Sequence, residues 1–160
     1  MKNIDVMWVG LSAKKVTDAE NLPPLHIDTN TGKLVAEIEA QCHHINFYKT
    51  NLVKFAPLDS KRKLRYPTLK ECVLCYPELQ IELQSVNPRV VLLLGNKTAT
   101  FVLHQFGFQM PKLSYTYQSF EHEKRWYVPI HHPSYIMVYK RKEKDQYIQA
   151  VKTVIKRLIA

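Results

Sequence analysis

The chain has 160 residues, of which 46% are hydrophobic and 23% are charged, a length and composition typical of one globular domain. Leu, Ile, Val and Phe make up 47 of the 160 residues, well above the roughly 20% below which chains are commonly disordered. No apolar run approaches the roughly 18 residues of a membrane span, and residues 1–5 show no pattern of a signal segment. Three cysteines cannot all pair within the chain, so we expect one monomeric domain over 1–160 in the reducing cytoplasm.

Basic side chains outnumber acidic ones by 23 to 14, which gives a formal net charge of +9. The excess is uneven, because residues 41–160 contain nineteen of the basic groups and eight of the acidic ones. Two basic clusters lie within 49–70 and 140–144. One-sided basic charge indicates a polyanionic partner, nucleic acid first, but a solvated surface that promotes solubility explains it equally well.

The first half of the chain predicts two strands and the helix between them. A β-rich segment over 4–9 stops at Gly10 and is the first predicted strand. After a loop over 11–30, apolar residues at helical spacing predict a helix from about Thr31. Residues 46–53 are predicted as a second short strand, which leads into a basic loop.

The second half continues this alternation of strand and helix. Thr68 and Glu71 have the spacing of a capping box and predict a helix that runs to about Val86. Val90–Leu94 is an unbroken apolar run, typical of a strand buried on both faces of a parallel sheet. The remaining predicted elements are a helix from 95, a strand over 126–130 and a last helix with apolar residues from 147 to 158. The pattern predicts an α/β fold with a parallel sheet covered on both faces.

Polar segments follow each of the four predicted strands. They are residues 10–15, 50–54, 95–97 and 131–135. Ligands of parallel sheets bind in the crevice at the carboxyl ends of the strands. We therefore expect the four segments to meet at one site, although this pattern alone identifies no reaction.

Three motifs in this order and spacing resemble the uracil-DNA glycosylase superfamily, most closely its iron–sulphur class, often called family 4. They are Thr50-Asn51-Leu52-Val53-Lys54, the run 67–95 that ends in Asn87-Pro88-Arg89-Val90-Val91-Leu92-Leu93-Leu94-Gly95, and His132-Pro133-Ser134-Tyr135. The resemblance covers nearly the whole chain. It implies a three-layer α/β/α sandwich on a four-stranded parallel sheet. It also implies an enzyme that extrudes a deaminated base from single- or double-stranded DNA and hydrolyses its N-glycosidic bond.

The resemblance implies that His132 stabilises the anionic leaving base and that Asn51 reads the edge of the base. An amide suits this reading because it offers a donor and an acceptor side by side. Gly10 and Leu11 are placed in the base pocket. The residues alone leave simpler alternatives open: a histidine satisfied by backbone in the turn before Pro133, and an asparagine that merely ends a strand.

The residue that positions the attacking water departs from the family pattern. The family's first motif usually supplies a carboxylate or an amide, whereas Leu11 and Ser12 stand there in this chain. Ser12 can orient water, but a hydroxyl is a poor base. Asp28 in the following loop is the second candidate, with capping of the next helix as its alternative. The family's stacking Phe corresponds to Ile27, and His26 beside it offers a smaller ring.

The resemblance also implies DNA contacts outside the base pocket. Ser134 and backbone amides near Ser12 would hold phosphates. Ile136 would fill the gap left by the extruded base, and core packing is an equally open interpretation of this residue. Further DNA contacts are assigned to Lys14, Lys97, Tyr135, Met137, Lys140 and Arg141.

We expect no metal or other cofactor. The family's cluster needs four thiolates, but Phe55 stands at one of those positions and only Cys75 lines up with another. A zinc site would draw on Cys42, Cys72 and Cys75 with His43 or His44. Ordinary buried thiols explain the same residues, and we prefer that interpretation.

Two functions remain open at this point. The first is a monofunctional glycosylase, a hydrolase that acts on uracil or a related base in DNA. The second is a weakly active or inactive module of the same fold, which recognises DNA lesions or ends. The altered first motif favours the second, whereas Asn51 and His132 favour the first.

Overall fold

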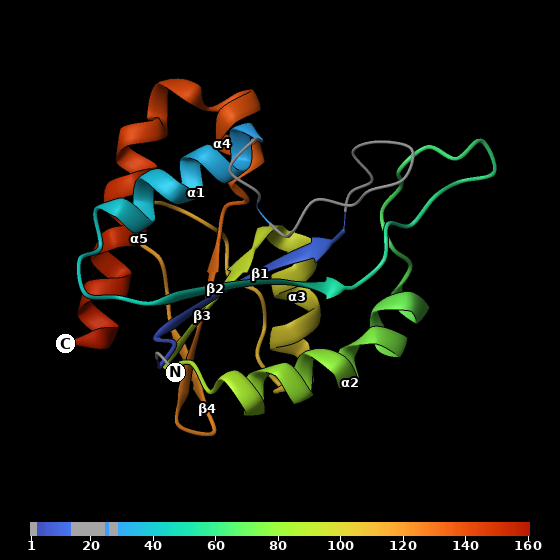
Figure 1. Cartoon of the computed structure of the whole chain (residues 1–160), viewed down its shortest axis with the longest axis horizontal. Coiled ribbons are helices and arrows are strands. Elements are labelled where there is room, and N and C mark those ends of the chain that lie inside the picture. Colours follow the sequence, from blue (N-terminus) through green and yellow to red (C-terminus); the bar gives the residue numbers. More distant parts are fainter. Residues whose placement is uncertain (1–2, 14–24, 26–28) are drawn as a thin grey trace.

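The computed structural model describes residues 3–13, 25 and 29–160. Five strands form one sheet in the order β2-β1-β3-β5-β4 (Figure 1). They are β1 (Val6–Ser12), β2 (Phe47–Val53), β3 (Val90–Leu94), β4 (Phe120–His122) and β5 (Arg125–Ile130). The strands β2, β1, β3 and β5 run parallel, whereas β4 pairs antiparallel with β5 at the edge. The predicted α/β sandwich is confirmed, but its sheet has a fifth strand.

The sequence prediction missed β4 because its turn carries an unusual residue pair. Glu123 and Lys124 join β4 to β5, and both have positive φ, 50° and 64°. Two-residue hairpin turns of this kind usually contain Asn or Gly, so this pair gave no turn pattern. The first strand also runs beyond its predicted end at Gly10, because Ser12 pairs with Val53 of β2.

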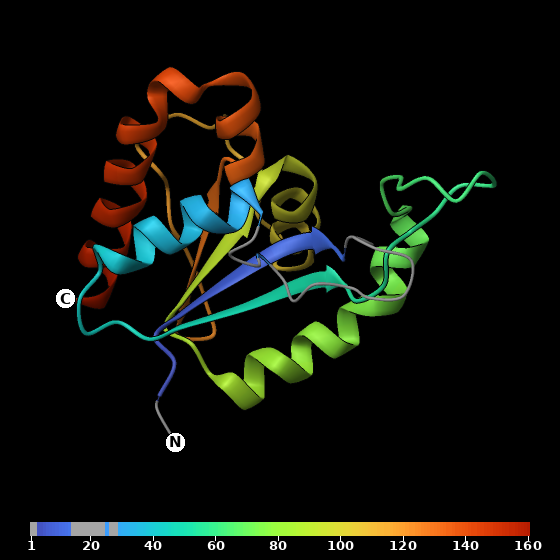
Figure 2. The same cartoon turned by 45° about the horizontal axis from the view of Figure 1, so that its top comes forward.

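Helices cover both faces of the sheet (Figures 1 and 2). The helices α1 (Asn30–Ala40), α4 (Pro133–Tyr139) and α5 (Lys144–Ile159) pack on one face, and α2 (Leu69–Val86) and α3 (Gly95–Gln105) pack on the other. A short 3-10 turn, η1 (Arg141–Glu143), joins α4 to α5. Within the described ranges, no helix is both long and apolar enough to span a membrane.

The central strand β3 contributes to both layers of the core. Its side chains alternate, so Val90, Leu92 and Leu94 face α1, α4 and α5, whereas Val91 and Leu93 face α2 and α3. None of the five is more than 1% exposed. The prediction of a strand buried on both faces is confirmed, and β3 thereby anchors the edge at which the site forms.

The sheet separates the three cysteines. Cys42 packs in the core layer of α1 and α5, whereas Cys72 and Cys75 of α2 pack in the layer on the opposite face. Burial raises the pKa of the Cys42 and Cys72 thiols, as expected of side chains in an apolar core. The three thiols therefore cannot share one metal ion, and the described residues contain no cluster of three or more metal-ligating side chains.

Both predicted helix starts can be traced to side-chain caps. The Thr29 hydroxyl accepts a hydrogen bond from the Gly32 backbone N–H at 2.9 Å, so Thr29 is the N-cap of α1. The alternative role of Asp28 as a cap of this helix or its turn falls on a residue outside the described ones. At α2, the Thr68 hydroxyl accepts from the Glu71 backbone N–H at 3.1 Å, and Glu71 Oε1 accepts from the Thr68 N–H at 2.8 Å. The predicted capping box is confirmed.

The capping box should make the stability of the protein sensitive to acid. The Arg65 guanidinium, 2.7 Å from Glu71 Oε1, and the Thr68 backbone N–H lower the pKa of Glu71 to about 2. Because this pKa lies below the value of 4.5 for an unperturbed glutamate, the stabilisation is complete above that pH and is lost as pH falls towards 2. Glu71→Gln should reduce the dependence of the melting temperature on pH in this window. Glu78→Gln, on an exposed position of α2, is the control, and an equal reduction in both variants would contradict the assignment.

Candidate active site

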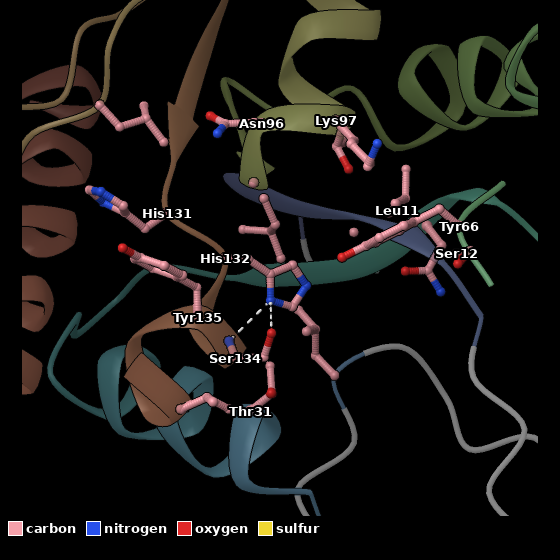
Figure 3. A pocket seen from close by; sticks show the side chains of 18 of the residues that line it. Leu11, Ser12, Thr31, Tyr66, Asn96, Lys97, His131, His132, Ser134 and Tyr135 are labelled. Carbon is pink, nitrogen blue, oxygen red and sulfur yellow. Dashed lines mark hydrogen bonds between the residues drawn. The ribbon is translucent and has the colours of Figure 1, made fainter. Parts of the chain in front are cut away.

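A cleft of about 1540 Å³ opens at the carboxyl edge of the sheet (Figure 3). The ends of β1 and β2, the start of α3 and the start of α4 all contribute to its walls, as the strand pattern predicted. Its described lining includes three basic side chains, Arg65, Lys97 and Lys112, and no carboxylate. A concave site with this charge attracts anionic ligands.

His132 lines the cleft at the junction of β5 and α4, where it is the N-cap residue of α4. Its Nδ1 accepts a hydrogen bond from the Ser134 backbone N–H at 3.0 Å and lies 2.8 Å from Ser134 Oγ (Figure 3). A ring nitrogen that accepts a hydrogen bond carries no proton. The contact with the Ser134 N–H thus favours the tautomer that carries its proton on Nε2, on the side turned away from Ser134. In this state the ring is a hydrogen-bond donor of fixed orientation.

Asn51 lies directly opposite Gly10 in the paired strands β2 and β1. A Cβ atom added to Gly10 would stand 2.5 Å from Asn51 Oδ1, which is closer than two such atoms can approach. The Asn51 amide thus occupies the space that only a glycine leaves open. Both residues line the cleft, so the pair presents a donor and an acceptor to a ligand there.

A polar cluster around Glu82 of α2 holds the end of β2. The Glu82 carboxylate accepts hydrogen bonds from the Tyr48 hydroxyl at 2.8 Å and the Thr50 hydroxyl at 2.9 Å, and it pairs with Lys54. Burial, followed by this carboxylate, raises the pKa of Tyr48 to about 12. Lys54 also donates to the backbone carbonyl of Asn51 at 2.5 Å. The cluster therefore fixes the backbone that presents the Asn51 amide.

Residues 6–156 match the family model described as the uracil DNA glycosylase superfamily. The chain belongs to this superfamily. It is 25% identical, over 150 residues, to the type-4 uracil-DNA glycosylase of Archaeoglobus fulgidus, and the match covers 89% of this chain and 71% of that protein. The fold resembles the crystal structure of wild-type SMUG2 from Pedobacter heparinus, with a TM-score of 0.61, 16% identity and coverage of 98% of this chain and 76% of that chain. The resemblance to a family 4-like uracil-DNA glycosylase is confirmed.

Other residues implied by membership of the uracil DNA glycosylase superfamily are also found at the cleft. Leu11, Ser12, Lys97 and Tyr135 line it, and the Lys97 ammonium lies 4.8 Å from the centre of the Tyr66 ring. Ser134 lines it too, but its N–H and hydroxyl face His132 Nδ1, a positioning role that the sequence did not indicate. The predicted residues Lys14, His26, Ile27 and Asp28 lie outside the described residues.

The structure corrects the interpretation of Ile136 as a residue that fills a gap in DNA. Its side chain is fully buried and packs in the core with residues of α1 and α5, because this face of α4 turns towards the sheet. Met137 is half-buried against the same core. Lys140 and Arg141 are exposed beyond the end of α4 and are absent from the described lining of the cleft. Their contacts with DNA remain predictions.

Two buried tyrosines hold the residue that precedes His132. The Tyr147 hydroxyl donates to the His131 carbonyl at 2.8 Å, and the Tyr117 hydroxyl lies 2.6 Å from His131 Nδ1. Burial lowers the pKa of His131. Gly95, the first residue of α3, has a φ of 86° and lies beside His132. A Cβ atom added to Gly95 would come 3.4 Å from His132 Cβ. No sequence pattern indicates this arrangement, because the two tyrosines come from segments far from His132 along the chain.

Proposed function

We propose that this protein is a DNA glycosylase that extrudes uracil, or a related deaminated base, and hydrolyses its N-glycosidic bond. The observation that carries the proposal is the hydrogen bond from the Ser134 N–H to His132 Nδ1, which orients the imidazole in a cleft shared with the Asn51 amide. Membership of the uracil DNA glycosylase superfamily supports it. In the proposed reaction the protein acts as a monomer and leaves the sugar–phosphate backbone intact.

The bond that breaks joins C1′ of the deoxyribose to a ring nitrogen of the base. Its electron pair leaves with the base, and the negative charge spreads to a carbonyl oxygen. A hydrogen bond from Nε2–H of His132 to this oxygen stabilises the charge as it develops. Water adds to C1′ and loses a proton, so the products are the free base and an abasic site. The Asn51 amide orients the base by pairing with its polar edge.

In this proposal Ser12 positions the attacking water, and Asp28 takes up the proton that the water loses. Ser12 ends β1 and lines the cleft, but a neutral hydroxyl is a poor base. A carboxylate is suited to this role, and the described lining contains none. Asp28→Asn should therefore slow base release, and an unchanged rate would remove Asp28 from the mechanism.

A second candidate function is recognition of damaged DNA without base removal. The observation that favours it is the first motif, where Leu11 and Ser12 stand in place of the carboxylate or amide that is usual in the family. Such a protein would keep the basic cleft and its affinity for DNA.

A single-turnover assay on labelled oligonucleotides separates the two functions. The substrates carry uracil in a single strand, opposite guanine or opposite adenine, and hypoxanthine and xanthine in the same contexts. Each product is analysed with and without alkali, because an abasic site breaks the strand only after alkali when the enzyme is monofunctional. Release of a base supports the glycosylase and identifies its substrate. Salt-sensitive DNA binding with no release from any substrate supports the recognition module.

A further inference from the structure

Three aromatic rings follow one another along the α4 side of the cleft. His131 and Tyr135 are parallel within 10°, with ring centres 5.9 Å apart, and the Tyr139 ring lies 5.6 Å from that of Tyr135. Tyr135 and Tyr139, four residues apart, lie on one face of α4, and His131 stands two residues before the helix begins. All three line the cleft, and Figure 3 shows His131 and Tyr135 on the opposite side of His132 from Tyr66 and Ser12. We call His131, Tyr135 and Tyr139 the aromatic ladder.

The outer rings of the aromatic ladder are accessible. Tyr135 is 40% exposed and Tyr139 is 73% exposed, although aromatic side chains of this size usually bury most of their surface. The inner residue, His131, is held at its ring by the Tyr117 hydroxyl and at its backbone carbonyl by the Tyr147 hydroxyl. The ladder is therefore fixed at its inner end and open to a ligand at its outer end.

The cleft is larger than a single extruded base requires. Sites for whole small molecules commonly enclose about 300–1,000 Å³, whereas this cleft measures about 1540 Å³. A cleft of this volume, which both Asn51 and the aromatic ladder line, has room for nucleotides next to the extruded base.

The polar lining complements these rings. Lys97 and Lys112 supply positive charge, and the described lining contains no acidic side chain. Arg65 also lines the cleft but is paired with Glu71. Positive charge along a groove together with successive aromatic rings is the combination by which proteins hold an unpaired nucleic-acid strand. Ile136, the residue expected to fill an opened duplex, is buried in the core. Together these features favour a flexible single strand over a rigid duplex at the ladder.

We propose that the aromatic ladder is a stacking subsite for the unpaired nucleotides next to the extruded base on the same strand. The bases stack on Tyr135 and Tyr139, and their phosphates face the basic side chains of the cleft. This inference rests on the proposed function for the identity of the ligand as DNA. Its consequence is a preference for single-stranded over duplex DNA.

The subsite is tested by the binding of oligothymidylate of about 12 nucleotides, a length within the span of known single-strand sites. Fluorescence anisotropy compares the intact protein with Tyr135→Ala, Tyr139→Ala, Tyr135→Phe and Tyr139→Phe. Loss of a stacking ring should weaken binding about tenfold, whereas the Phe variants should remain within about twofold of the wild type. Leu74→Ala, 75% exposed on α2 and outside the described lining, is the control for surface changes.

Wild-type affinity for oligothymidylate in both alanine variants would overturn the inference. A loss confined to duplex DNA would also overturn it, because it would mean that Tyr139 enters the duplex instead. The 73% exposure of Tyr139 makes its variant informative even when Tyr135→Ala fails to fold. Oligothymidylate contains no uracil, so the subsite is measured independently of base release, and the two proposals can fail separately.

Discussion

His132→Ala is expected to lower the single-turnover rate of base release by about 10²- to 10³-fold, the usual effect of removing one preorganised donor to a developing oxyanion. Affinity for the substrate should change little, because the hydrogen bond forms fully only as charge appears on the leaving base. The rate is measured with saturating protein on the best uracil substrate, and affinity by anisotropy on the same oligonucleotide.

His104→Ala is the matched control for the loss of a histidine. His104 is exposed near the end of α3, outside the described lining of the cleft, so this variant should keep the wild-type rate. The rate of Ser134→Ala should lie between those of His132→Ala and His104→Ala, because the Ser134 backbone N–H still donates to His132 Nδ1 after the hydroxyl is removed. Equal rates in His132→Ala and wild type would refute the proposed role of His132.

Gly10→Ala should abolish most activity while leaving the protein folded. The new Cβ would stand 2.5 Å from Asn51 Oδ1, and the cheapest response is rotation of the Asn51 side chain out of its position. We expect a rate close to that of Asn51→Ala, reduced by about 10²-fold as for other groups that orient a substrate. The melting temperature should stay close to that of the wild type, because Oδ1 is the end of a side chain and no backbone has to move.

A double-mutant cycle tests whether the two residues act as one unit. If Gly10→Ala acts only through Asn51, the double variant with Asn51→Ala should be no slower than either single variant. Gly107→Ala provides the opposite case. Gly107 has φ of 83° with nothing near an added Cβ, so that variant should lose about 1 kcal/mol of stability and keep its activity. If the rate losses of the two single variants multiply in the double variant, Gly10 acts by a route that does not involve Asn51.

The parts of the fold that sequence analysis predicted correctly depend on local patterns. The apolar run of β3 and the Thr68 and Glu71 pair specify a buried strand and a capped helix without reference to the rest of the chain. The meeting of Asn51 and His132 at one cleft was also predictable, because both follow parallel strands of one sheet.

The parts that sequence analysis missed depend on contacts between distant segments. Ile136 points into the core because α4 packs against α1 and α5. A helix of only seven residues is too short for its apolar spacing to predict which face is buried. Glu82 acquires its role only when α2 lies beside β2. The hydroxyls of Tyr117 and Tyr147 reach His131 across 14 and 16 positions of the chain, and no short motif encodes such a contact.

The separation of the cysteines by the sheet supplies a built-in probe of local unfolding. Cys42 is 3% exposed, and Cys72 and Cys75 are 7% and 8% exposed, so a thiol reagent reaches each only when its own layer opens. Labelling of Cys42 therefore reports fluctuations of the layer formed by α1 and α5, and labelling of Cys72 and Cys75 reports those of α2. The two layers can thus be followed independently in the unmodified protein, and DNA that closes the cleft would slow whichever layer it restrains.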